Sequence, residues 1–255
     1  MAASLRSTIA TPEGKRRYVR RLFATIADRY DFITRFLSYG QDRRWKRRLI
    51  QLAELTTSDR VLDLACGTGD LVLDAAPHVR RAVGLDVTHR MLQLAARRKM
   101  KPGFIFDGTR EIRPGFVFDT VSFLTGDMIA LPISDASFDV VTTGYGLRNV
   151  PDLDRALAEI HRVLVPGGRL LSLDFNRPRN PAVRAGYLAY LTIVGSALGF
   201  ILHRDPDTYR YIPESIRNYP GAQGVAGMME ARGFRDVRVI PVLGGLMAIH
   251  VARRT

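Results

Sequence analysis

Residues 61–70, V-L-D-L-A-C-G-T-G-D, constrain the fold of this chain more than any other segment. A short apolar run with one acidic residue breaks into a glycine-rich turn, and the L-V-L-D-A-A that follows can be helical. Strand, glycine-rich turn and helix in this order build the nucleotide site of doubly wound α/β sheets, at the carboxyl end of the first strand. Gly67 and Gly69 would let a ligand approach the backbone closely. The segment therefore predicts an α/β fold with a nucleotide site at this corner.

The residues around the turn favour a cationic ligand over a dinucleotide. The dinucleotide motif G-x-G-x-x-G/A needs a small residue where this chain has Val72, and an aspartate at the helix start would repel a pyrophosphate. Asp63 and Asp70 are expected to form an acidic rim that suits a sulfonium. Asp86 ends the next apolar run 19 residues after Gly67, close to the spacing expected of a carboxylate that binds ribose hydroxyls. Together these features indicate S-adenosylmethionine (SAM), with a plain strand–turn–helix corner as the alternative.

A third acidic position extends the predicted site. Residues 121–124 are predicted to form a strand, and Thr125-Gly126-Asp127-Met128 follow at its carboxyl end. Asp127 would accept a hydrogen bond from the exocyclic amine of adenine, and Met128 would cover the ring face. A simple loop is the alternative.

The order of the remaining elements predicts a Rossmann-like class I SAM-dependent methyltransferase fold of the α/β class. Five strand-and-helix units precede residues 237–242 and 247–251, which are predicted to form a closing antiparallel hairpin. Dehydrogenases more often continue with parallel strands. We therefore expect a mostly parallel seven-stranded sheet with an antiparallel terminal hairpin. An N-terminal helical cap over residues 1–58 would precede a methyltransferase domain over residues 59–255.

The formal net charge is +13, with 34 arginines and 4 lysines. Such a charge suits a nucleic acid or an anionic membrane, but the G-Y-G-L-R-N after the fourth predicted strand differs from the Asn/Asp-Pro-Pro-aromatic sequence that grips a flipped base. We therefore expect no nucleic-acid partner. Residues 13–30 are predicted to form a basic amphipathic helix, which could lie on a membrane or pack on the core. The only cysteine, Cys66, excludes an intrachain disulfide, fits a reducing compartment and is expected to be a packing residue.

Residues 185–202 carry no charge over 18 positions, which is at the lower edge of what a membrane-spanning helix needs. Glycines and hydroxyl side chains within the segment weaken that interpretation. We expect a hydrophobic lid insertion around residues 178–220 that covers an apolar substrate, with a core helix pair as the alternative. The chain is expected to be cytoplasmic, with peripheral contact at the inner face of an anionic membrane as an option.

With these residues considered, the chain resembles the UbiE/COQ5 family of quinone C-methyltransferases over roughly residues 20–253. The specific motifs are G-L-R-N-V at 146–150, E-S-I-R at 214–217 and G-G-L-M-A-I-H at 244–250, whereas D-L-A-C-G-T-G-D at 63–70 marks only the superfamily. Departures include Phe32-Ile33-Thr34, where the family has Asn-like polarity, and Asp174, where a Glu is common. The insertion at residues 101–120 is also extra, and its two Pro-Gly segments could form a hairpin.

The resemblance implies methyl transfer from SAM to a ring carbon of a prenylated quinol. The substrate it favours is demethylmenaquinol, with a 2-polyprenyl-6-methoxy-1,4-benzoquinol of ubiquinone biosynthesis, or an RNA or other small molecule, as alternatives. No metal is implied, and a homodimer is left open. The SAM contacts implied by the resemblance or by the glycine turn are Asp63, Gly67, Thr68, Gly69, Asp86, Val87, Asp127, Met128 and Gly144.

The chemistry of such a transfer suggests catalytic candidates beyond the fourth predicted strand. Arg148 and Asn149 would hold the quinol oxygens, and the Arg148 cation would stabilise a phenolate. Tyr30 and His250 are further candidates. The structural alternative for Arg148 is a salt bridge to Asp152 or Asp154, and for His250 a purely structural role.

Overall fold

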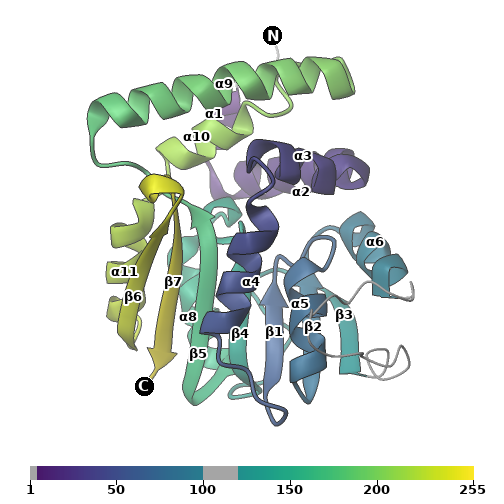
Figure 1. Cartoon of the computed structure of the whole chain (residues 1–255), viewed down its shortest axis with the longest axis vertical. Helices are drawn as coiled ribbons and strands as arrows, with labels where there is room; N and C mark the ends of the chain where they lie inside the picture. The colour runs from purple at the N-terminus through teal and green to yellow at the C-terminus, as the bar shows by residue number, and fades with distance from the viewer. Residues whose placement is uncertain (1–4, 100–119) are drawn as a thin grey trace.

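The computed structural model describes residues 5–99 and 120–255. Its centre is a seven-stranded sheet in the order β3-β2-β1-β4-β5-β7-β6 (Figure 1). Neighbouring strands are parallel from β3 to β5, β7 is antiparallel to β5, and β6 is antiparallel to β7. The predicted fold class, with its terminal hairpin, is confirmed. The strands are β1 (Arg60–Leu64), β2 (Arg81–Asp86), β3 (Val121–Thr125), β4 (Phe138–Gly144), β5 (Leu164–Phe175), β6 (Phe234–Val242) and β7 (Met247–Arg254).

Helices cover both faces of the sheet, so the central strands are apolar on both sides. On one face α4 (Asp42–Leu52) and α5 (Asp70–Ala75) form a core with Val61 and Val140. On the other face α8 (Leu153–Val163) and α11 (Gly221–Ala231) pack on Leu62 and Val141. Alternate residues of one strand thus enter opposite cores. The helix α6 (His89–Lys99) contacts β2 and β3 near the sheet edge.

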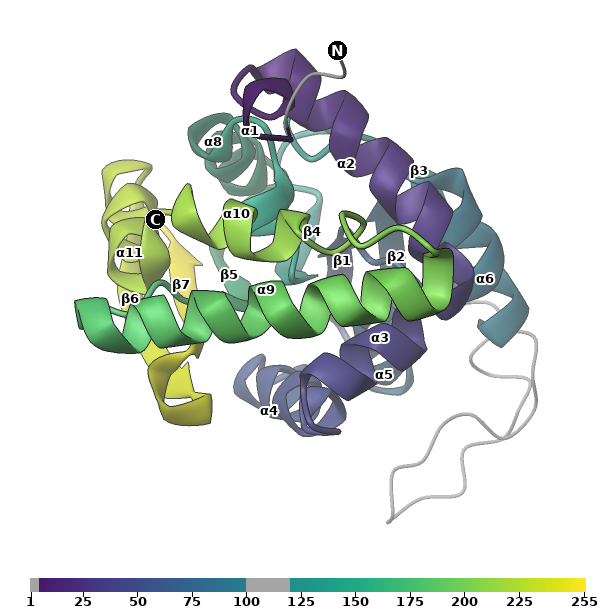
Figure 2. The ribbon, with the colours of Figure 1, turned by 90° about the horizontal axis from the view of Figure 1, so that it is seen from above.

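A helical layer lies over the carboxyl ends of the parallel strands (Figures 1 and 2). Its N-terminal part is α1 (Leu5–Thr8), α2 (Pro12–Ile26), the 3₁₀ turn Ala27–Arg29 and α3 (Tyr30–Leu37), and its later part is α9 (Pro181–His203) and α10 (Tyr211–Arg217). The two parts share a hydrophobic cluster, in which Ile26 and Ile33 pack with Leu198 and Tyr209. The segments predicted as cap and lid therefore pack together in one helical layer over the sheet.

The apolar segment expected to be a lid is one long helix, α9, and the alternative of a helix pair is wrong. Asn180 caps it by accepting from the backbone N–H groups of Ala182 and Val183, and Pro181 occupies the first turn. The helix ends at Arg204, which has a left-handed backbone. The hairpin expected within residues 101–120 falls almost wholly outside the described ranges.

Candidate active site

The glycine-rich corner after β1 is a tight turn that carries three left-handed residues. Ala65, Gly67 and Gly69 have φ of 52°, 54° and 88°. The backbone N–H of Gly67 donates to Asp86 Oδ2 at 2.9 Å, and the N–H of Thr88 donates to Asp86 Oδ1 at 2.7 Å. Asp86 therefore joins the ends of β1 and β2, and burial raises its pKa.

A cavity of about 90 Å³ lies against this corner. Of the predicted SAM contacts, its lining includes Gly67, Asp86, Val87, Asp127, Met128 and Gly144. An acidic group beside the corner and apolar side chains further along the cavity fit a nucleoside, with the carboxylate for the ribose and the apolar walls for the base. Gly69 does not line it, because Ala95 fills the space beside Gly69: a Cβ there would lie 3.2 Å from the Ala95 methyl.

The helix α2 forms the outer wall of this cavity, which we call the cofactor cavity because it lies where the sequence predicts the SAM site. Val19 and Phe23 line it, and Arg16 Nη2 lies 2.8 Å from Asp127 Oδ2. The other oxygen, Asp127 Oδ1, accepts from the Ile129 N–H. An adenine amine can therefore use Asp127 only by sharing it with Arg16 or replacing it. This partner of Asp127 was not predicted.

The two acids of the predicted rim, Asp63 and Asp70, both lie at this corner, and neighbouring groups offset part of their charge. Asp70 Oδ2 lies 2.7 Å from Lys46 Nζ, and Asp70 Oδ1 lies 2.7 Å from Arg98 Nη1. Burial would raise the pKa of Asp70, but these two cations lower it to about 2. Asp63 accepts a hydrogen bond from Thr142 at 2.9 Å, and burial raises its pKa to about 7. Asp70 is thus compensated by two cations, whereas Asp63 is about half protonated near pH 7.

Asp63 and Thr68 line a narrow recess of about 20 Å³ next to the cofactor cavity. The Thr68 hydroxyl donates to Asp31 at 2.6 Å and accepts from Arg98 at 3.1 Å. Its side chain thereby ties α3 and α6 to the turn.

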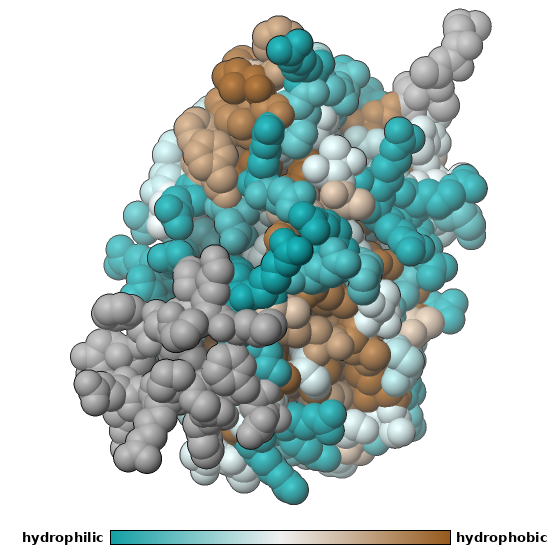
Figure 3. All heavy atoms as spheres, turned by 90° about the vertical axis from the view of Figure 1, so that its right-hand side faces the viewer, coloured by the Kyte–Doolittle hydropathy of each residue, from teal (hydrophilic) through white to brown (hydrophobic). Residues whose placement is uncertain are grey.

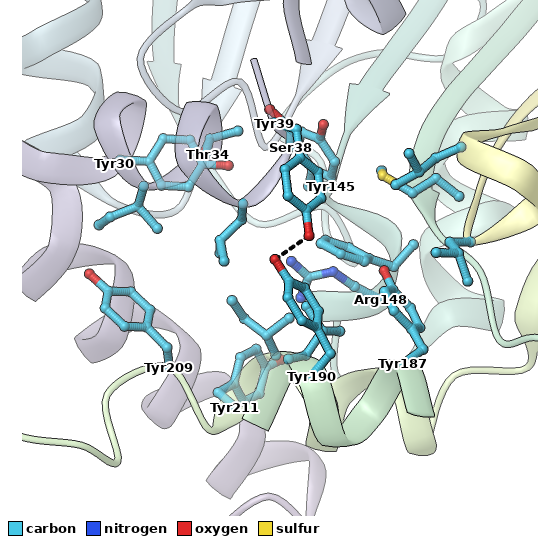
Figure 4. A pocket seen from close by; sticks show the side chains of 18 of the residues that line it. Tyr30, Thr34, Ser38, Tyr39, Tyr145, Arg148, Tyr187, Tyr190, Tyr209 and Tyr211 are labelled. Carbon is cyan, nitrogen blue, oxygen red and sulfur yellow. Dashed lines mark hydrogen bonds between the residues drawn. The ribbon is translucent and has the colours of Figure 1, made fainter. Parts of the chain in front are cut away.

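A second, larger cavity of about 440 Å³ opens under the helical layer. Its walls are mainly apolar, with Ile33, Leu191 and Ile212 among them, and several tyrosines project into it (Figure 4). The hydroxyls of Tyr39 and Tyr190 are hydrogen-bonded to each other and join the end of α3 to α9. Such a space suits an aromatic ring with an apolar tail.

Arg148 lies in the 3₁₀ turn Leu147–Asn149 after β4 and lines the larger cavity. Its Nε is 3.1 Å from Asp174 Oδ1, and its backbone N–H donates to Asp174 Oδ2 at 3.1 Å. Its Nη1 donates to Asn149 Oδ1 and Ser215 Oγ, and its guanidinium lies 4.8 Å from the centre of the Phe175 ring. Both charged side chains are buried. Arg148 is therefore a fixed cation in the cavity wall.

The salt-bridge partners considered for Arg148 are wrong. Asp152 caps α8 by accepting from the Arg155 N–H, and Asp154 pairs with Arg232. Asp152 is therefore used to cap the helix that follows it in the sequence. Asp174, on the neighbouring strand β5, lies beside Arg148 and becomes its partner.

The other catalytic candidates lie in different settings. Asn149 Nδ2 donates to the Tyr145 carbonyl at 2.7 Å, so its amide braces the loop at the edge of the cofactor cavity. Tyr30 lines both cavities, and burial raises its pKa to about 12. His250 is absent from the linings of both cavities, and its ring is hydrogen-bonded to Ser172 Oγ at 3.0 Å and to the Ala222 carbonyl at 2.8 Å. His250 therefore braces β7.

Two residues that the sequence did not indicate complete the site. Tyr145 lines both cavities, as Tyr30 does. Lys15 of α2 donates through Nζ to the carbonyls of Arg148 and Val150, at 3.0 and 2.7 Å. The helical layer is thus bonded directly to the loop that carries Arg148.

Comparison with known proteins shows which family the chain resembles. A model of the ubiE/COQ5 methyltransferase family matches residues 11–254. A demethylmenaquinone methyltransferase of Thermus thermophilus is 40% identical over 236 residues, covering 91% of this chain and 100% of the relative. A demethylmenaquinone methyltransferase of Deinococcus radiodurans is 37% identical, covering 92% of each chain. The ubiquinone/menaquinone biosynthesis C-methyltransferase UbiE of Teredinibacter turnerae is also 37% identical, covering 91% of this chain and 89% of the relative.

Solved structures support the fold. A SAM-dependent methyltransferase from Thermotoga maritima superposes with a TM-score of 0.62 at 17% identity, covering 93% of this chain and 100% of the other. A SAM-dependent methyltransferase from Aquifex aeolicus gives a TM-score of 0.56 at 16% identity, covering 82% of this chain and 89% of the other.

Proposed function

The chain belongs to the ubiE/COQ5 methyltransferase family, and we propose that its substrate is demethylmenaquinol, which it converts to menaquinol. It is a SAM-dependent enzyme that methylates a quinol ring carbon. The observation that supports a tailed quinol is that the two cavities are neighbours and share wall residues. Tyr30 and Tyr145 line both the cofactor cavity and the apolar cavity, so a ring held between them would face the methyl donor.

The chain's own residues bind and orient the reactants. When bound, SAM supplies a methyl group already activated by its sulfonium. Asp86 and Asp127 would hold the ribose and adenine, and Gly67 leaves room beside the backbone. The helical layer excludes water from the ring, which strengthens electrostatic interactions inside the site.

Arg148 is proposed to stabilise negative charge on a quinol oxygen. A ring carbon becomes nucleophilic when the neighbouring hydroxyl loses its proton, and a fixed cation favours that phenolate. Asp174, Asn149 and Ser215 hold the guanidinium in place, so little reorganisation is needed during the reaction. Tyr30 is proposed to contact the ring at the junction of the cavities.

The function is tested by incubating the protein with labelled SAM and each reduced quinone, then measuring product mass. We expect demethylmenaquinol to gain one methyl group on carbon, and the methoxybenzoquinol to react more slowly. Faster reaction of the benzoquinol would assign the enzyme to ubiquinone biosynthesis. Label transfer to neither quinol would contradict the proposal.

We also propose that the helical layer rests on the cytoplasmic face of an anionic membrane. The helix α9 is long and apolar enough to span a bilayer by length and composition, yet only 28% of its most apolar stretch is buried in the protein. Its buried residues Leu188, Leu191 and Leu198 pack on other helices, which favours an interfacial helix over a spanning one. The exposed residues of its outward face are uncharged: Ala185, Ala189, Ile193, Ala197, Phe200 and Ile201.

More apolar surface surrounds α9. Phe32, Phe36 and Tyr39 of the α3 region and Leu243 of the terminal hairpin are exposed. Figure 3 shows one apolar patch at the top of the molecule, at the level of α9 in Figure 1, and a second one lower on the same face. A groove beside Leu243 is lined by three arginines of α4: Arg44, Arg47 and Arg48. Apolar surface with a basic border suits an anionic lipid surface.

The variant Ile193→Glu/Phe200→Glu is expected to lose membrane binding. Each side chain contributes about 1.5 kcal/mol when buried in lipid, so the pair should lower partitioning about 100-fold. Co-sedimentation with phosphatidylglycerol vesicles measures this partitioning.

Ser58→Glu, which adds a negative charge in the loop before β1, is the matched control and should bind as the parent does. Equal binding of parent and double variant would contradict the membrane proposal, as would equal binding to zwitterionic and anionic vesicles.

A further inference from the structure

The Tyr145 hydroxyl connects the reaction site to a buried carboxylate that has no role in the mechanism above. It donates to Asp42 Oδ1 at 2.5 Å, across 103 positions of sequence. Tyr145 and Asp42 are 7% exposed each. Because Tyr145 lines both cavities, this bond leads from the junction of the two cavities into the protein interior.

The backbone of Tyr145 is held in a conformation that an L-residue rarely adopts. Its φ is 62°. Its N–H donates to the Leu173 carbonyl at 2.7 Å, and its carbonyl accepts from Asn149 Nδ2 at 2.7 Å. Strain of this kind persists where neighbouring bonds enforce it, and it is concentrated at functional sites. Here the enforced turn coincides with the bond between the Tyr145 phenol and Asp42.

Asp42 begins a chain of charged groups that reaches the surface. Asp42 Oδ2 lies 2.7 Å from Lys46 Nζ, which lies 2.7 Å from Asp70 Oδ2. Asp70 Oδ1 lies 2.7 Å from Arg98 Nη1, which lies 3.5 Å from the half-exposed Asp31. Burial would lower the pKa of Lys46, but Asp70 and Asp42 raise it above its usual range. Lys46 therefore stays charged, and it forms an ion pair with Asp42.

The titratable groups around Tyr145 come from three other elements. Lys46 and Asp42 lie on α4, with Lys46 Nζ 5.5 Å from the centre of the Tyr145 ring. Tyr30 of α3 and Asp174 of β5 also act electrostatically on the phenol. Asp174 is already paired with Arg148. Among these groups, Asp42 is the one carboxylate bonded to the Tyr145 hydroxyl.

We propose that Tyr145 and Asp42 form the proton acceptor for the quinol hydroxyl. The O–H bond of the quinol breaks, its proton passes to the Tyr145 oxygen, and the Tyr145 proton passes to Asp42 Oδ1. The electron pair left on the quinol oxygen makes the adjacent ring carbon nucleophilic, and a carbon–carbon bond to the methyl group forms as the carbon–sulfur bond of the donor breaks. The hydrogen on that ring carbon leaves as a proton to water, and Asp42 returns its proton through Tyr145 to the ring oxygen. One proton is released for each methyl group transferred.

This inference rests on the proposed quinol substrate, and Tyr145→Phe tests it. General acid–base groups contribute about 100-fold or more to a rate, so we expect the variant to lose about 100-fold in kcat at pH 7. The loss should shrink as the pH rises, because hydroxide then ionises the quinol without the relay. Asp42→Asn should show the same dependence, and the SAM Kd of Tyr145→Phe, measured by calorimetry, should stay within about twofold.

Tyr219→Phe is the matched control, since Tyr219 is a buried phenol that is absent from the linings of both cavities. It should leave kcat unchanged at every pH. Two results would overturn the relay: a kcat of Tyr145→Phe within threefold of the parent, or a loss that is the same at every pH. If the parent enzyme itself fails to methylate the quinol, the proposed substrate fails instead.

Discussion

Arg148→Met is expected to lower the rate of quinol methylation about 100-fold or more while SAM binding persists. Loss of one preorganised group that stabilises a developing anion has an effect of this order. Arg148 lines the apolar cavity and is absent from the lining of the cofactor cavity. The rate falls because the quinol phenolate loses its fixed cation. Single-turnover kinetics at saturating SAM, with calorimetry for SAM binding, measure the two effects separately.

The same substitution should destabilise the protein in a pH-dependent way. The Asp174 side chain is 1% exposed. Removing Arg148 leaves its charge buried without a partner, which should lower the free energy of unfolding by about 3 kcal/mol. Burial raises the pKa of Asp174, and Arg148 opposes that rise. In the variant, the folded-state pKa therefore lies further above the unfolded one. The stability deficit should be small in acid and should grow as the pH rises through the folded pKa, which urea unfolding at pH 5 and pH 8 would reveal.

Arg232→Met is a matched control for this pair, because Arg232 bonds Asp154 at the surface with both side chains about half exposed. It should change neither turnover nor the pH dependence of stability. Arg148→Lys should recover stability better than turnover, since lysine keeps a charge but lacks the planar guanidinium. Full turnover in Arg148→Met would remove Arg148 from the mechanism.

The parts of the fold that follow local rules were predictable from the sequence. A buried parallel strand needs a near-continuous apolar run, and its carboxyl end meets those of its neighbours at one edge. Asp86 and Asp127 therefore had to lie close to the glycine corner once β1, β2 and β3 were assigned. The closing hairpin was visible from its two short apolar runs around Gly244 and Gly245.

The charges of the site were not predictable, because they depend on contacts between distant segments. Asp70 looked like a free acid in the sequence, but Lys46 and Arg98 reach it from other helices. Arg148 seemed closest to acids in the next turn, but the strand pairing of β4 with β5 brings Asp174 beside it. Tyr145 carried no signal at all, since nothing near it in the sequence indicates a bond to Asp42. The residue types indicated which chemical groups the site contains, whereas tertiary packing determines which of these groups are already paired with other side chains.

Removing the prenyl tail should raise KM steeply while kcat changes little. The cavity of about 440 Å³ under α9 is lined mainly by apolar side chains. Each CH₂ group buried there contributes about 0.8 kcal/mol, so one isoprene unit contributes about 3 kcal/mol, or roughly 100-fold in affinity. Binding energy from the tail is present before and during methyl transfer, so its loss should appear in KM. The effect should level off once the tail reaches beyond the cavity, because further units then lie outside the protein.

A series of demethylnaphthoquinols with no, one, two and three isoprene units tests this expectation. Leu191→Ala removes part of the cavity wall under α9, so it should raise KM for the tailed substrates more than for the tailless one. The tailless substrate serves as the control within the same variant. The tailless quinol should still be methylated at saturating concentration, because Arg148 and Tyr145 line the part of the cavity that we propose for the ring. Equal KM values across the series would show that the space under α9 does not hold the tail, and the lid role of this helix would then have to be abandoned.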